Sequence, residues 1–211
     1  MTLFPLYIVT DRAVAGGDPV EILMRVAASL PPGTVGVEIR EKALPARELL
    51  ALARRVVAAL RPLGARVLVN DRLDVAIAAG ADGVHLPASG LDPRAVRAVY
   101  PGLIGVSTHS RAELAGLDAG AADFATFGPV FDTPSKRGFG PPQGVDALRA
   151  AVAASRVPVM AIGGIMQGTA ADLAGTGISG IAVIRAVLAA RNPAAAARDL
   201  LDAAGLGTAV G

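Results

Sequence analysis

The stretch RVLVNDRLDVAIAAGADGVHL, residues 66–86, indicates how this chain folds. It contains an apolar run at Arg66–Asn70, a helical pattern over Leu73–Ala79 and a second apolar run at Gly83–Leu86. Gly80 follows the helical pattern, and glycine suits the left-handed residue that ends many helices. A strand, a helix and a strand in this order predict two parallel strands joined by a helical crossover.

The same unit recurs along the whole chain. The predicted strands are Leu6–Thr10, Val35–Arg40, Arg66–Asn70, Gly83–Leu86, Ile104–Thr108, Phe124–Gly128, Val157–Ile162 and Gly180–Ile184. The predicted helices are Pro19–Ser29, Ala46–Leu60, Leu73–Ala79, Pro93–Val99, Arg111–Asp118, Val145–Ala154, Thr169–Ala174 and Pro193–Ala204. Eight strand–helix units in 211 residues predict an α/β fold, a single (β/α)8 TIM barrel domain over residues 1–211. A doubly wound open sheet is the alternative, but the chain lacks an early GxGxxG segment.

Proline and glycine mark the expected helix ends. The pairs Asp18-Pro19, Asp92-Pro93 and Asn192-Pro193 each combine a capping side chain with a proline suited to the first helical position. Gly80, Gly120 and Gly177 are expected at helix C-termini.

Composition narrows the class of protein. Hydrophobic residues make up 53% and aromatic residues 3%, so the core consists mainly of Ala, Val, Leu and Ile, as in parallel strands buried on both faces. The absence of cysteine excludes disulfides and thiolate metal sites. A net charge of +2 with few aromatics and no basic run disfavours nucleic acid as a partner. The chain shows neither a signal-peptide pattern nor an apolar run near 18 residues, so a cytoplasmic protein without a membrane partner is expected.

Polar residues gather where the predicted strands end, which is the active-site end of such barrels. Glu38, Arg40 and Lys42 alternate along one strand, so their side chains point to the same side. The other strands end in Thr10-Asp11, Asn70-Asp71, Ser107-Thr108-His109, Gly163-Gly164 and Ile184-Arg185, and His85 lies on the fourth. A barrel without a site would not need such a set.

The loop FGPVFDTPSKRGFGPPQG, residues 127–144, has the composition of a phosphate-closing segment. Thr133, Ser135, Lys136 and Arg137 are donors, and glycines allow the backbone to approach a ligand closely. Gly163-Gly164 follows the seventh strand, where barrels often bind phosphate with backbone N–H groups. A small phosphorylated molecule is therefore the expected ligand.

Each of these residues also has a structural interpretation. Arg40 and Lys42 fit surface cations paired with Glu38 or Glu41. Asn70-Asp71 fits a turn and helix cap, and Gly163-Gly164 fits a plain turn. For His85 the structural role is favoured over the catalytic one, and for His109 the two stay open.

In the segments that carry these residues, the chain resembles thiamine phosphate synthases. The matching segments are LYIVTD (6–11), VEIREK (37–42), VNDR (69–72), GADGVHL (80–86), GVSTHS (105–110), FGPVFDTPSK (127–136), AIGGI (161–165) and IAVIRAV (181–187). The resemblance implies a (β/α)8 barrel and a transferase that joins a pyrimidine diphosphate to a thiazole phosphate. The reaction releases pyrophosphate and uses Mg²⁺.

The resemblance also implies roles for individual residues. Arg40, Lys42, Ser107 and Lys136 would be the catalytic residues that hold the diphosphate together with Asn70, beside Glu38. Asp71 would bind Mg²⁺. Thr133, Ser135 and the backbone of Gly164 and Ile184 would hold the thiazole phosphate. Pro134, Gly163 and Arg185 are further substrate-binding candidates, and Arg185 would either add a cation to that phosphate or fill the site.

Three positions depart from the family's pattern. Glu38 stands where the family usually has Gln, and Arg185 where it usually has Ser. Ser89 stands where a second magnesium-binding Asp is usual, and Asp11 or Asp132 is a hypothetical substitute.

Two alternative functions stay open. The segment LPASG (86–90) resembles the related thiazole tautomerases, which shift a proton without a metal, although Pro129 stands at the position of their acid–base His. The other alternative is a non-catalytic relative that binds a phosphate ligand. A homo-oligomer also stays open.

Overall fold

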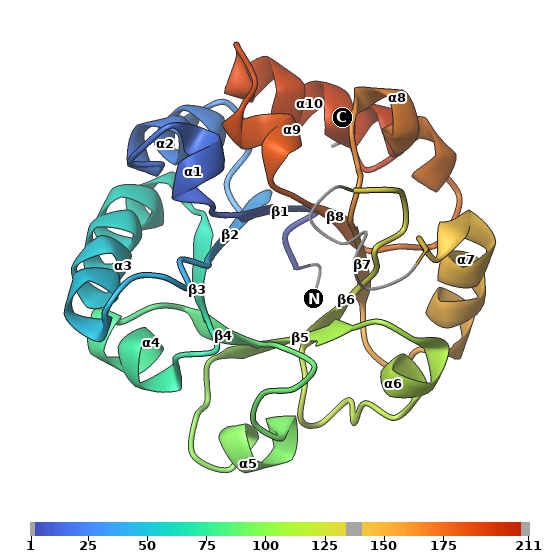
Figure 1. The fold of residues 1–211 in the computed structure, drawn as a ribbon, viewed down its shortest axis with the longest axis horizontal. Helices are drawn as coiled ribbons and strands as arrows, with labels where there is room; N and C mark the ends of the chain where they lie inside the picture. The colour runs from blue at the N-terminus through green and yellow to red at the C-terminus, as the bar shows by residue number, and fades with distance from the viewer. Residues whose placement is uncertain (1–2, 134–140, 208–211) are drawn as a thin grey trace.

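The protein folds into a closed parallel barrel, as predicted. The structure is a computed structural model that describes residues 3–133 and 141–207. Its strands follow one another around the ring in chain order, and β8 pairs back with β1 through Leu6 and Ile181 (Figure 1). The strands are β1 (Leu6–Val9), β2 (Val35–Ile39), β3 (Arg66–Asn70), β4 (Gly83–Leu86), β5 (Leu103–Thr108), β6 (Phe124–Phe127), β7 (Val159–Ile162) and β8 (Gly180–Val183).

Helices surround the barrel on its outer side (Figure 1). They are α1 (Arg12–Ala15), α2 (Val20–Ala28), α3 (Ala46–Leu60), α4 (Leu73–Ala79), α5 (Pro93–Arg97), α6 (Arg111–Ala115), α7 (Gly144–Ala154), α8 (Gln167–Ala170), α9 (Arg185–Leu188) and α10 (Pro193–Ala203), with 3-10 helices η1 (Arg61–Leu63) and η3 (Ala171–Leu173). The sequence did not predict α1 or α9, because a four-residue helix is too short to show a helical period. Within the described residues, none of these helices is long and apolar enough to cross a membrane.

Three of the six predicted helix ends are confirmed. At the Asp18-Pro19 pair, Pro19 and not Asp18 is the N-cap of α2, although the Asp18 carboxylate accepts from the Val20 N–H at 3.0 Å. Asp92 and Asn192 cap α5 and α10 through their side chains, and Gly80 ends α4 with a φ of 64°. The prediction for Gly120 is wrong, because α6 ends at Ala115 and Gly116 caps it in a right-handed conformation. Gly177 has a φ of 81° but lies beyond η3, which Ala174 caps.

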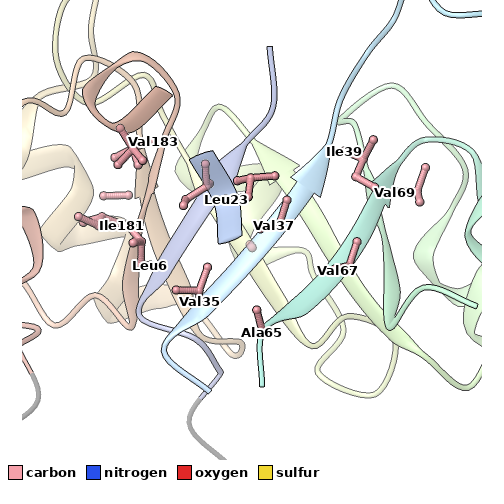
Figure 2. Close-up of a cluster of buried hydrophobic side chains, with 14 of the residues drawn as sticks. Leu6, Leu23, Val35, Val37, Ile39, Ala65, Val67, Val69, Ile181 and Val183 are labelled. Carbon is pink, nitrogen blue, oxygen red and sulfur yellow. The ribbon is translucent and has the colours of Figure 1, made fainter. Parts of the chain in front are cut away.

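Side chains alternate between the two faces of each strand. On β2, Val35, Val37 and Ile39 face outward and join the buried cluster against the helices, beside Val67 and Val69 of β3 (Figure 2). These aliphatic side chains and Ala53, Val56 and Val57 of α3 make the larger core. The aliphatic core expected from the composition is confirmed.

The barrel interior holds a second, smaller cluster. Phe4, Tyr7, Leu68, Phe124, Met160 and Ala182 fill it. Inward-facing glycines make room for the aromatic rings, since a Cβ built on Gly105 would lie 2.5 Å from Cζ of Phe124 and 2.6 Å from Nδ1 of His85. The alternation that puts this cluster inside also turns Glu38, His85 and Ser107 toward the barrel axis.

Candidate active site

A layer of polar side chains lies above the interior cluster, near the carboxyl ends of β2 to β5. Nδ2 of Asn70 donates to Oε1 of Glu38 at 2.8 Å. Nε2 of His85 lies 3.0 Å from Oγ of Ser107, and Nδ1 of His85 lies 3.3 Å from the hydroxyl of Tyr7. The structure therefore brings the predicted residues Glu38, Asn70 and Ser107 together through His85, a residue for which the sequence favoured a structural role.

Burial determines the charge of this layer. Glu38 and His85 are 3% and 1% exposed. Burial lowers the pKa of the His85 imidazole below its ordinary value of 6.5, Glu38 opposes this shift and Arg40 adds to it. Burial, followed by the charge of Glu38, raises the pKa of the Tyr7 hydroxyl well above 10.0. His85 is therefore neutral and Tyr7 protonated at neutral pH.

Arg40 continues the inward-facing positions of β2 just beyond the end of the strand. Its backbone N–H donates to Oγ1 of the buried Thr10 at 3.0 Å, which ties the ends of β1 and β2 together. The half-buried guanidinium is close enough to His85 to affect the pKa of that ring. Arg40 thus lies at the polar layer, as the sequence predicted.

A pocket of about 300 Å³ opens beside this layer, at the ends of β2, β3 and β4. Its lining includes Lys42, Asn70 and Asp71, three residues that the sequence assigned to the site. Asp71 adopts a left-handed conformation with a φ of 60°, and its N–H donates to the His85 carbonyl at 2.9 Å. A non-glycine residue in this conformation is uncommon and often marks a functional position.

Glu41 lines the same pocket, although its sequence context predicted only an ion pair with Arg40 or Lys42. One of its carboxylate oxygens, Oε1, is buried without a hydrogen-bond partner among the described residues. The other oxygen accepts a long hydrogen bond of 3.4 Å from the Arg12 N–H. A buried carboxylate oxygen without a partner is costly, so a cation facing it would be favourable. Asp71 and Glu41 both line this pocket, and carboxylate oxygens are the type of ligand that Mg²⁺ prefers.

The hypothetical substitutes for an acid at Ser89 lie elsewhere. Oδ1 of Asp11 accepts from the Val14 N–H at 3.1 Å and caps α1. Neither Asp11 nor Asp132 is part of the pocket lining, and Ser89 is exposed. In the described part of the chain, no three His, Asp or Glu residues form a cluster suited to a metal. A cation here would therefore depend on few protein ligands.

The opposite side of the barrel mouth contains the glycine pair. Gly163 and Gly164 have φ values of 98° and 66°, and a Cβ on Gly164 would lie 2.5 Å from the Asp132 carbonyl oxygen. The Phe131 N–H donates to the Gly163 carbonyl at 3.0 Å. The pair therefore packs the segment after β7 against the segment after β6, more than a plain turn requires.

The remaining predicted residues are distributed around this side. Thr133 is half-buried, Ile184 precedes α9, and Arg185 is the exposed first residue of α9. Pro134, Ser135, Lys136 and Arg137 lie outside the described residues.

His109 has a structural position beside this segment. Its Nδ1 donates to the Gly128 carbonyl at 2.7 Å, and its own carbonyl accepts from Gln143 at 2.9 Å. It therefore holds the segment that follows β6.

Comparison with known proteins connects this arrangement to a family. Residues 6–187 match the family model described as thiamine monophosphate synthase. This chain belongs to the thiamine monophosphate synthase family. The resemblance seen in the sequence is confirmed, and the family is one of transferases.

Individual relatives cover nearly the whole chain. A thiamine-phosphate synthase of Methanoculleus marisnigri is 44% identical over 94% of this chain and 94% of its own length. One of Moorella thermoacetica is 40% identical over 96% of each. The solved structure of a thiamine phosphate pyrophosphorylase from Pyrococcus furiosus superposes with a TM-score of 0.82 at 31% identity, covering 96% of each chain.

Proposed function

We propose that this family member condenses 4-amino-2-methyl-5-hydroxymethylpyrimidine diphosphate with a thiazole phosphate, giving thiamine phosphate and pyrophosphate. The observation that carries the proposal is the pocket whose lining includes Lys42, Asn70 and Asp71. A cation, an amide and a carboxylate at one barrel mouth suit a diphosphate with its divalent cation. The names of the relatives support the same reaction.

The proposed chemistry needs charge neutralisation more than acid–base catalysis. The bond between the pyrimidine's methylene carbon and the diphosphate oxygen breaks, and its electron pair leaves with the diphosphate. The thiazole supplies the electron pair of the new bond to that carbon. Arg40 and Lys42 would stabilise the charge that develops on the leaving diphosphate, with Asn70 and Ser107 as further donors. Lys136 has the same proposed role.

Magnesium fits the residues of the pocket. Asp71 and Glu41 would hold it, with the remaining positions taken by water and diphosphate oxygens. The bound cation would supply further positive charge to the leaving group. In this proposal Glu41, and not Asp11 or Asp132, is the second carboxylate ligand.

The thiazole phosphate is proposed to bind on the other side of the mouth. Gly163 and Gly164 bring backbone close to this region, and Thr133, Ile184 and Arg185 lie on the segments after β6 and β8. The roles of these residues, and of Pro134 and Ser135, stay predictions from the family resemblance. Binding the two phosphorylated substrates on opposite sides of the mouth would bring the thiazole close to the methylene carbon, as an alkyl transfer requires.

The alternatives receive less support. Pro129 has no titratable group to shift a proton, so the tautomerase lacks its acid–base residue at that position. A cytoplasmic location and a homo-oligomer remain predictions.

The test is a pyrophosphate-release assay with both substrates. Release should require both substrates and Mg²⁺, and Lys42→Ala should lower the rate at least tenfold because a cation facing the diphosphate is lost. Arg149→Ala, which removes a surface cation paired with Asp146 on α7, is the matched control and should leave the rate unchanged. No release at saturating substrate would refute the proposal. Proton exchange on a thiazole carboxylate phosphate in the presence of a chelator would favour the tautomerase instead.

A further inference from the structure

A chain of three polar side chains runs from the closed interior of the barrel to its mouth. It begins with Tyr7 on β1, continues through His85 on β4 and ends at Ser107 on β5. Tyr7 is fully buried among the interior aromatic rings, with its ring edge-on to Phe124 at a centroid distance of 5.5 Å. Ser107 is half-buried, so it is the member of the chain nearest to solvent.

The Tyr7 hydroxyl is a proton donor in this chain. Its raised pKa keeps the proton in place, and a buried hydroxyl needs an acceptor for it. Among the described residues its hydrogen-bond partner is Nδ1 of His85, at 3.3 Å. Nδ1 of His85 therefore accepts a hydrogen bond from Tyr7.

This contact selects the tautomer of His85. A ring nitrogen that accepts a hydrogen bond carries no proton, so a Nδ1 that accepts from the Tyr7 hydroxyl places the ring's N–H on Nε2. Nε2 then donates to Oγ of Ser107 at 3.0 Å.

Glu38 is the competing influence on the ring. Its Oε2 lies 3.9 Å from Nδ1 of His85, and a carboxylate favours a proton on the nitrogen that faces it. That separation is too long for a hydrogen bond. A proton on Nδ1 would also leave the buried Tyr7 hydroxyl without its acceptor, which costs about 1–3 kcal/mol.

The tautomer decides what Ser107 can offer to a ligand. A serine hydroxyl has one hydrogen and two acceptor lone pairs. When Oγ accepts from His85, the hydrogen is free to point into the site. When Oγ donates to His85, only lone pairs face the site, and these repel an anion.

We propose that Tyr7 and His85 are positioning residues that direct the Ser107 hydroxyl hydrogen toward a diphosphate oxygen. The inference rests on the proposed function, in which Ser107 faces the diphosphate. The relay makes Ser107 an obligatory donor, so it favours an anionic ligand at the centre of the barrel mouth.

Binding of inorganic pyrophosphate with Mg²⁺, measured by calorimetry, tests the relay. Tyr7→Phe keeps the ring and removes the donor, which frees His85 to turn its proton toward Glu38. Pyrophosphate should then bind about tenfold more weakly, the effect of losing one hydrogen bond to a charged group. Tyr100→Phe is the matched control, since the only other tyrosine donates to the Ala81 carbonyl far from the mouth, and it should leave binding unchanged.

A double-mutant cycle separates positioning from a general loss of packing. Ser107→Ala alone should weaken binding to a similar extent. Adding Tyr7→Phe to it should cause no further loss, because Tyr7 acts only through Ser107. Additive losses in the double variant would overturn the relay.

Nitrogen NMR reads the tautomer without any substrate. The chain has two histidines, so His109→Gln leaves the His85 signals alone in the spectrum. The proton should be on Nε2, and should move to Nδ1 in the Tyr7→Phe variant of this background. A proton on Nδ1 while Tyr7 is present would overturn the inference. If the tautomer and the coupled binding losses hold but no pyrophosphate is released in the assay above, the proposed function fails and the relay stands.

Discussion

At the scale of the residue, Glu38 shows how one position sets the charge of the site. It is a buried carboxylate that accepts from Asn70 at 2.8 Å and lies next to His85. Its negative charge lies among the groups proposed to hold a diphosphate. It therefore orients Asn70 and at the same time opposes the anion.

Replacing this carboxylate predicts tighter anion binding. Glu38→Gln keeps an oxygen that can accept from Asn70 and removes the charge. A unit charge about 10 Å away is worth about 1–2 kcal/mol at the effective dielectric of proteins, so pyrophosphate with Mg²⁺ should bind about fivefold more tightly in calorimetry. Glu21→Gln on the exposed face of α2 should have no effect. Weaker binding by Glu38→Gln would mean that orienting neighbours outweighs the repulsion.

At the scale of the element, the alternation of side chains between the two faces of β2 positions residues of both the core and the site. Its odd-numbered residues pack against the helices and its even-numbered ones face the interior, so one strand serves the core and the site together. The helices pack against these strands through aliphatic contacts, and capping side chains stabilise the helices themselves. α10, for example, begins with the Asn192 side chain accepting from the Ala195 N–H at 3.1 Å.

The cap of α10 gives a prediction about stability. Asn192→Ala leaves that N–H without its partner and should lower the free energy of unfolding by about 1 kcal/mol in urea denaturation. Asn192→Asp retains an acceptor at the same place, so its free energy of unfolding should stay close to that of the parent protein. Equal loss in both variants would argue against the side-chain cap as the cause.

At the scale of the whole molecule, closure of the barrel makes the buried polar layer possible. β8 pairs with β1, so the strands close around the whole circumference of the interior, and His85 is 1% exposed. The pKa of His85 is lowered in the folded protein, with Tyr7, Glu38 and Arg40 facing the ring. The unfolded chain therefore binds a proton below about pH 6.5 that the folded barrel resists.

Stability should accordingly fall as the pH drops below about 6.5. A group whose pKa is lower in the folded protein stabilises the fold fully at pH values above its unfolded pKa. This stabilisation is lost as the pH falls from the unfolded pKa toward the folded pKa. Because of this one proton, the free energy of unfolding measured in urea should change by at most about 1.4 kcal/mol per pH unit. Between about pH 6.5 and 5, the free energy of unfolding of His85→Gln should depend less on pH than that of the parent protein. Parallel curves over that range would rule out His85 as the source.

The sequence by itself determined the strand–helix units, and with them the barrel. Each unit depends on local patterns: a short apolar run, an amphipathic helix, a capping residue or a glycine. Period-two alternation also placed Glu38 on the inner face of its strand, and strand ends pointed to Asn70 and Ser107. The alternation could not place Lys42, because β2 ends at Ile39 and Lys42 lies in the turn that follows. Such patterns involve residues close together in the chain, so they can be recognised without a structure.

Only the tertiary structure decided how Tyr7 meets His85 and where the buried oxygen of Glu41 lies. Tyr7 and His85 are 78 residues apart in sequence and come from strands that are not neighbours in the barrel. Their contact follows from strand register and from closure of the ring. These are properties of all the strands together, so no local stretch of sequence carries them.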